Sequence, residues 1–139
     1  MRAAIAATAL LLALPAATGF ACGHCVEDKI AAVYDHAVVS RALEHKHQVV
    51  FYAIDGPLAP GDASRHALEA LADSSYGVDR GSARASIETA SLSVAFDPGK
   101  VGYAVLERTL SRRFAARKLS LFPLRIMDKP AQLNAVNRR

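Results

Sequence analysis

The sequence has few of the residues that hold small domains together or form common catalytic sites. It contains two cysteines and no tryptophan. Both cysteines fall in one tetrapeptide, Cys22-Gly23-His24-Cys25, so they cannot link distant parts of the chain and the fold must rest on its hydrophobic core. The sequence has no Gly-rich phosphate loop, no His-Glu-x-x-His pair and no Gly-x-Ser-x-Gly motif. Nothing outside the tetrapeptide indicates catalysis, and we expect a protein that is not an enzyme.

A large excess of charge is also missing. The chain carries 17 Lys and Arg against 13 Asp and Glu, a formal net charge of +4, which is too small to indicate a nucleic-acid partner. The one basic concentration, in residues 108–118, falls on a predicted amphipathic helix and is typical of a solvated helix face. We therefore expect no nucleic acid among the partners.

The first 21 residues have the pattern of a secretion signal. Arg2 precedes an uncharged run at residues 3–14 that is apolar except for Thr8, and small residues follow after Pro15. The run is shorter than the roughly 20 apolar residues that span a bilayer. We expect residues 1–21 to be removed, leaving a periplasmic or secreted protein with no membrane span and with Cys22 at its N-terminus. A retained anchor and a lipidated Cys22 are the alternatives.

Residues 22–47 are predicted to form one N-terminal helix led by the cysteine pair. Apolar residues recur at three- and four-residue spacings between residues 26 and 46, and Glu27 and Asp28 suit the positive end of a helix dipole. The positions predicted to face inward are Val26, Ile30, Val33, Tyr34 and Ala37.

Residues 48–54 are predicted to form a strand that is apolar on both faces. One face would carry Val49, Phe51 and Ala53, and the other Val50, Tyr52 and Ile54. A strand of this kind is usually covered on both sides. Later helices would cover one face of the sheet, and either the first helix or a second copy of the protein, in a homodimer, would cover the other.

The rest of the chain completes an α+β pattern. We predict a helix over 62–74, two strands around 83–87 and 92–96 joined by a short turn, a helix over 101–118 and a strand over 119–127. The proline at position 123 favours an edge position for the last strand. The order β-α-β-β-α-β is that of a ferredoxin-like sandwich. This domain would occupy residues 48–129, and residues 130–139 would form a flexible tail.

Several segments of this domain resemble the heavy-metal-associated domains of copper chaperones and copper-transporting ATPases. The resemblance covers about residues 48–127. The resemblance rests on Ile54-Asp55-Gly56 at the end of the first strand, residues 66–71 in the helix, the strand 92–96 and the turn Asp97-Pro98-Gly99. The resemblance implies a ferredoxin-like fold and a metal ion as ligand.

The chain departs from that family in the loop that holds the metal. The family has a pair of cysteines after the first strand, whereas residues 57–62 of this chain contain no thiol, so no metal-binding role carries over to this loop. The tetrapeptide Cys22-Gly23-His24-Cys25 looks like the family's metal loop, displaced to the start of the mature chain. The domain thus resembles a member that has lost its own site.

The cysteine pair is the candidate metal site. Two cysteine thiolates near a helix start form a soft ligand set, and the positive end of the helix dipole stabilises them. Cu(I) accepts two sulfurs, so Cys22 and Cys25 would suffice as ligands and His24 would assist. Zn(II) normally requires four ligands and fits less well. The predicted function is therefore an exported soft-metal binding protein, in the first place for copper, whose partner would be a metal-transport protein.

Two other interpretations of the pair stay open. Protein disulfide isomerases contain the same four residues, but the strand and tryptophan that usually precede that motif are missing, which weighs against a periplasmic thiol-disulfide oxidoreductase. The pair could also close an internal disulfide in a non-catalytic interaction or dimerisation module. Among the histidines, His36 lies too far along a straight helix to reach the thiols, and His45 and His47 would form at most a separate weak site.

Overall fold

The computed structural model describes residues 25–129, which form four helices and four strands. In chain order these are α1 (Val26–Val33), α2 (His36–Glu44), β1 (Gln48–Asp55), α3 (Asp62–Asp73), β2 (Arg84–Ser86), β3 (Ser91–Phe96), α4 (Tyr103–Ala115) and β4 (Ser120–Met127). From β1 onward the order is β-α-β-β-α-β, as predicted from the sequence.

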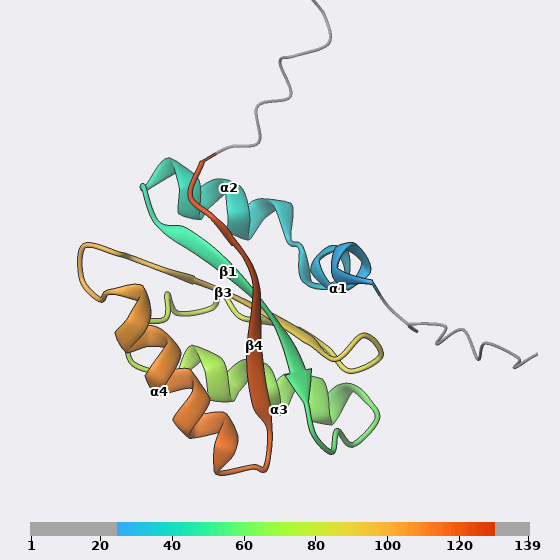
Figure 1. The fold of residues 1–139 in the computed structure, drawn as a ribbon. Helices are drawn as coiled ribbons and strands as arrows, with labels where there is room; N and C mark the ends of the chain where they lie inside the picture. Colours follow the sequence, from blue (N-terminus) through green and yellow to red (C-terminus); the bar gives the residue numbers. More distant parts are fainter. Residues whose placement is uncertain (1–24, 130–139) are drawn as a thin grey trace, which may run out of the picture.

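The four strands form one sheet in the order β2-β3-β1-β4. Each strand is antiparallel to its neighbours, so β1 and β3 are central and β2 and β4 are the edges. This is the strand order of a split βαβ arrangement. Figure 1 shows α3 and α4 on one face of the sheet and α1 and α2 on the other, which gives three layers.

The alternation of side chains along β1 divides the interior into two hydrophobic clusters. Val50, Tyr52 and Ile54 pack against α3 and α4, whereas Val49 and Phe51 pack against α1 and α2. The largest contributors from α4 are Leu106, Leu110 and Phe114, all fully buried. The two-faced apolar pattern therefore correctly indicated a strand covered on both sides, and helices of the same chain, not a second copy, provide the second cover.

The prediction of one N-terminal helix is wrong, because the helix is interrupted at Tyr34 and Asp35. Tyr34 has an extended backbone at the end of α1, and Asp35 begins α2 as its N-cap. The Asp35 carboxylate accepts hydrogen bonds from the Ala37 and Val38 N–H groups at 2.9 and 3.2 Å. Two short helices at an angle can follow the twisted sheet, whereas one straight helix would leave it (Figure 1).

The break also corrects the predicted inward face of this segment. Ile30 and Val33 are buried as expected. Val26 and Tyr34 are 46% and 42% exposed, and Ala37 is exposed as well. The buried residues of α2 are Val39 and Ala42.

Both edges of the sheet are protected from further pairing. β2 has only three residues, and side chains of α3 bind backbone N–H groups at its start: Glu69 accepts from Ala85 at 3.1 Å and Asp73 from Ala83 at 2.9 Å. β4 carries Pro123 opposite Tyr52 of β1, which confirms the predicted edge position of this proline. Short strands and prolines are common means of blocking edge-to-edge association.

Two buried side-chain polar atoms form no hydrogen bond within residues 25–129, the Tyr52 hydroxyl and the Arg113 Nε atom. Tyr52 is a fully buried residue of β1, and burial first, then the neighbouring Tyr103 hydroxyl, raise the pKa of its phenol. An unpaired hydroxyl in an apolar core costs stability. Within residues 25–129, no helix has both the length and the apolar character needed to cross a membrane.

Candidate metal centre

Cys25 is the part of the predicted ligand set that the structure describes. It is exposed and occupies the N-cap position of α1, with an extended backbone at φ −71° and ψ 170°. Its carbonyl accepts the first hydrogen bond of the helix, from Lys29 N–H at 3.1 Å, but its side chain forms no capping hydrogen bond. The sulfur is therefore not needed to complete the helix start. Cys22 and His24 lie outside the described residues.

α1 is fastened to the sheet along its length. Ser93 of β3 donates a hydrogen bond to the Val33 carbonyl at 2.8 Å, which fixes the end of the helix. The Lys29 ammonium donates to the Thr89 carbonyl at 2.5 Å, in the turn between β2 and β3. Together with the burial of Ile30, these contacts hold α1, the helix that begins after Cys25, against the sheet.

An ion pair lies close to Cys25 and involves Glu27, two residues after it in the chain. The Arg125 guanidinium, on β4, donates to both carboxylate oxygens of Glu27, in the first turn of α1. The hydrogen bond and charge of Arg125 lower the pKa of Glu27, and Glu27 in turn raises the pKa of Arg125. Because Arg125 compensates the Glu27 charge, this carboxylate repels a neighbouring thiolate less than an isolated one would.

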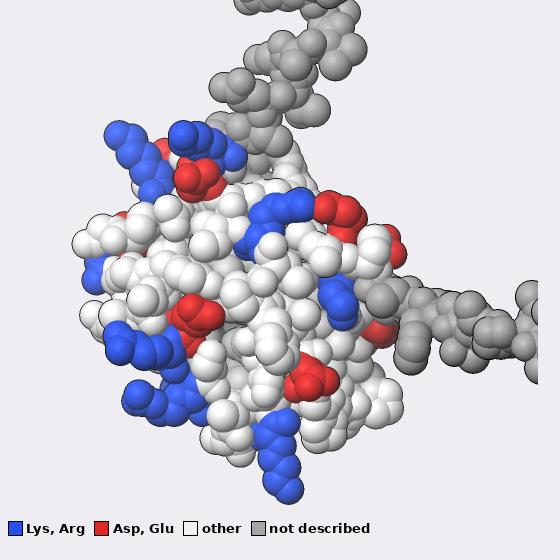
Figure 2. Space-filling view, viewed as in Figure 1, with Lys and Arg blue, Asp and Glu red and all other residues white. Residues whose placement is uncertain are grey.

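Around β4 the surface consists largely of uncharged side chains, with some acidic ones among them (Figure 2). Figure 2 shows Lys and Arg mainly towards the rim of this face, with uncharged residues over most of its centre. Two large apolar residues of β4, Phe122 and Ile126, are 54% and 42% exposed.

The loop after β1, at residues 56–62, contributes to packing of the hydrophobic core and contains no thiol. Gly56 has φ +123°, and a Cβ at this position would lie 2.5 Å from the Lys118 carbonyl, so the chain passes closely here. Leu58 is partly buried against the α3–α4 side of the core. The loop thus closes over the hydrophobic core.

The other histidines lie apart from Cys25 in contacts of their own. His36 lies 3.4 Å from the Ser40 hydroxyl on α2, and His66, an exposed residue of α3, pairs with Glu69. His45 and His47 have ring centroids 6.1 Å apart. Within residues 25–129, no group of three or more His, Cys, Asp and Glu could hold a metal ion.

His47 has two carboxylate neighbours that the sequence did not indicate. Its Nδ1 atom lies 2.6 Å from Asp79, in the connection between α3 and β2, and its Nε2 atom lies 3.6 Å from Asp97, after β3. These residues are separated by 32 and 50 positions in the chain, and no local pattern predicts such a contact. His47 therefore belongs to a cluster with Asp79 and Asp97, and His45 is its neighbour rather than its direct partner.

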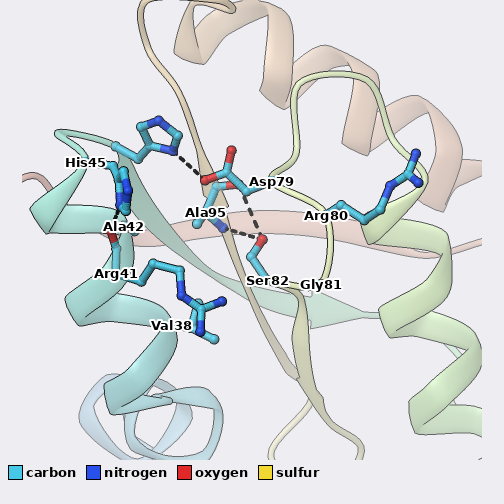
Figure 3. Close-up of a pocket in the computed structure, with 10 residues that line it drawn as sticks. Val38, Arg41, Ala42, His45, Asp79, Arg80, Gly81, Ser82 and Ala95 are labelled. Carbon is cyan, nitrogen blue, oxygen red and sulfur yellow. Dashed lines mark hydrogen bonds and ion pairs between the residues drawn. The ribbon is translucent and has the colours of Figure 1, made fainter.

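A cleft lies beside this cluster, between α2 and the turn at residues 79–82, and we call it the α2 cleft. Its volume is about 260 Å³. Figure 3 shows Arg41 and His45 on the α2 side and Asp79 and Ser82 on the other, with the Arg80 side chain directed away from α2. The His45 Nδ1 atom donates to the Arg41 carbonyl at 2.7 Å and so completes the end of α2.

Comparison with known proteins gives a distant likeness in structure and none in sequence. No family model matches the chain, and no curated protein matches it. Among solved structures, it is similar to oxidized MerP from Ralstonia metallidurans CH34, with 18% identity and a TM-score of 0.44 over 55% of this chain and 96% of that one. It is also similar to the CopZ metallochaperone, with 19% identity and a TM-score of 0.40 over 53% and 98%. The fold itself rests on the strand order β2-β3-β1-β4 described above.

Proposed function

We propose that this protein is an exported, non-enzymatic binding protein for a soft metal ion, with Cu(I) as the preferred ion and Cys22 and Cys25 as ligands. The observation that carries the proposal is the position of Cys25, exposed at the N-cap of a helix that is fastened to the sheet, with a side chain that makes no capping bond. Two thiolates at such a position form a soft ligand set beside uncompensated backbone N–H groups.

The displaced tetrapeptide supports the same conclusion. The tetrapeptide resembles the metal loop of heavy-metal-associated domains, and the loop at residues 57–62, where that family has its cysteines, contains no thiol. His24, inside the tetrapeptide, would assist binding as a third donor. Zn(II) is less favoured, because the pair and His24 provide three of the four ligands that a structural zinc site requires. A metal-transport protein is the partner that this function would require.

The test is a Cu(I) titration of the purified protein under reductant and without oxygen, against a chromogenic chelator that competes for the ion. We expect about one Cu(I) per chain, a loss of binding when both cysteines are replaced by serine, and weaker binding in His24→Ala. His66→Gln is the matched control, since His66 is exposed on α3, and it should bind as the wild type does. Unchanged copper retention in the double-serine variant would overturn the proposal.

The same variants separate this function from thiol-disulfide exchange. An exposed thiol at a helix start also suits exchange chemistry. Catalysed reduction of insulin by the wild type, and its loss in the double-serine variant, would favour an oxidoreductase over a metal-binding protein. We expect no catalysis above the rate that the reductant alone gives.

A further inference from the structure

The Asp79 carboxylate fixes the Nδ1 atom of His47 as a hydrogen-bond donor. The Nδ1 atom of His47 lies 2.6 Å from the Asp79 carboxylate, and a carboxylate only accepts hydrogen bonds. Nδ1 therefore carries a proton, and in the neutral imidazole the lone pair lies on Nε2. A carboxylate that orients a histidine through Nδ1 is a common arrangement behind metal-binding histidines.

The Nε2 atom faces a second carboxylate at a distance that suits a shared ion. Asp97 Oδ2 lies 3.6 Å from His47 Nε2, which is long for a direct hydrogen bond. Two ligands that each lie about 2.0 Å from one tetrahedral metal are roughly 3.3 Å apart. The other oxygen of Asp97 accepts a hydrogen bond from the Gly99 N–H at 2.8 Å, so Oδ2 is the one turned towards the imidazole.

The negative charges of Asp79 and Asp97 around His47 also favour a bound cation. Within residues 25–129, the only ion-pair partner of either Asp79 or Asp97 is His47. The three side chains together carry a net negative charge whether or not the imidazole is protonated, and Arg41 and Arg80, which line the neighbouring cleft, form no ion pair with either carboxylate. The side chains of His47 and Asp97 are 23% and 26% exposed, so an ion between them would keep access to water while losing part of the bulk screening.

We propose that His47 Nε2 and Asp97 Oδ2 form a second metal site, for a divalent ion of the zinc class, with Asp79 as a positioning residue. Imidazole nitrogen and carboxylate oxygen suit Zn(II) and Co(II) rather than Cu(I). The described part of the chain provides no third ligand, so water from the open side completes the coordination and binding is weak. The site is independent of Cys22 and Cys25.

The test uses the purified protein with both cysteines replaced by serine, so that its result does not depend on the proposed Cu(I) site. Zn(II) is added while the histidine side-chain ¹⁵N and ¹H signals are followed by NMR. We expect a saturable shift of the His47 Nε2 signal, and Co(II) should broaden the same signal. If His47 is only a protonated ion-pair partner of the two carboxylates, its signals will not move with Zn(II), and the proposal is wrong.

Four variants in that background assign the residues. His47→Gln and Asp97→Asn should each weaken Zn(II) binding at least tenfold, and Asp79→Asn should weaken it about tenfold. Asp79→Asn should also shift the tautomer balance of His47 in the metal-free protein, a change that a general loss of stability would not cause. His66→Gln is the control and should stay within twofold of the parent. An equal loss in His66→Gln and His47→Gln, with all variants folded by thermal melting, would contradict the site.

Discussion

Asp35 and Arg84 join the break between α1 and α2 to the edge strand β2. The Arg84 Nε atom lies 2.9 Å from one oxygen of Asp35, and the other oxygen caps α2. Arg84 also donates to the Gly81 and Ala83 carbonyls at 3.0 and 2.8 Å. One carboxylate thus sets where α2 begins and where the N-terminal layer meets the sheet.

Replacing Asp35 by alanine should destabilise the protein by about 1–2 kcal/mol, the usual cost of losing an N-cap together with a partly exposed ion pair. Asp35→Asn is the matched control, because asparagine is an equally good N-cap and loses only the ion pair. Urea unfolding followed by circular dichroism measures both. Equal losses in the two variants would show that the cap contributes nothing.

Stability should fall in acid partly through the same carboxylate. The pKa of Asp35 lies below its ordinary value of 3.8, first because the Val38 N–H binds it and then because of Arg84. A lowered pKa in the folded state means that the contribution is present above the unfolded value and is lost as the pH falls through the folded one. Urea midpoints between pH 5 and 2 should therefore fall less steeply in Asp35→Asn than in the wild type. Parallel curves would contradict this assignment.

The contact between α1 and the sheet can be tested with two residues of the same helix. Ile30 is buried at 5% exposure, whereas Val26 is 46% exposed. Ile30→Ala should cost about 2–4 kcal/mol, and Val26→Ala should cost less than about 0.5 kcal/mol. Urea unfolding gives both values. Similar costs for the two variants would mean that α1 does not pack as described.

Removing the buried hydroxyl of Tyr52 should not lower the stability of the protein. Because this hydroxyl has no partner among the described residues, Tyr52→Phe should be neutral or stabilise the protein by up to about 1 kcal/mol. Tyr76→Phe, at a 70% exposed position, is the control and should be neutral. The measurement is again the urea midpoint. A destabilisation above about 1 kcal/mol would contradict this and indicate a bound water or a hydrogen bond to the neighbouring Tyr103.

The sequence allowed the βαββαβ part of the fold to be predicted because its signals are local. The continuous apolar run of β1 and the three- and four-residue spacing of Leu106, Leu110 and Phe114 in α4 indicate a strand and a helix from local pattern alone. The break before α2 was missed because apolar spacing continues through it. The available signal was Asp35, a strong N-cap residue inside an apparent helix.

The site could be predicted only where its residues are neighbours in the chain. The cysteine pair is visible as a tetrapeptide, and Cys25 does lie at a helix start. The pairs Glu27–Arg125 and His47–Asp97 join residues 98 and 50 positions apart. Such contacts depend on how the N-terminal layer packs on the sheet, and no short-range pattern encodes them.

The Glu27–Arg125 pair should tune Cu(I) binding at the neighbouring cysteines. Replacing Arg125 by glutamine leaves the Glu27 carboxylate uncompensated two residues after Cys25, where it repels a negatively charged copper–thiolate centre. We expect Cu(I) affinity to fall about two- to fivefold in Arg125→Gln, and the double variant with Glu27→Gln to recover it. The competitive titration measures this at low salt, and 0.5 M KCl should shrink the difference by screening. If Arg125→Gln binds Cu(I) as the wild type does at low salt, then the charge beside Cys25 does not act on the metal, and the ion pair serves only to fasten α1 to β4.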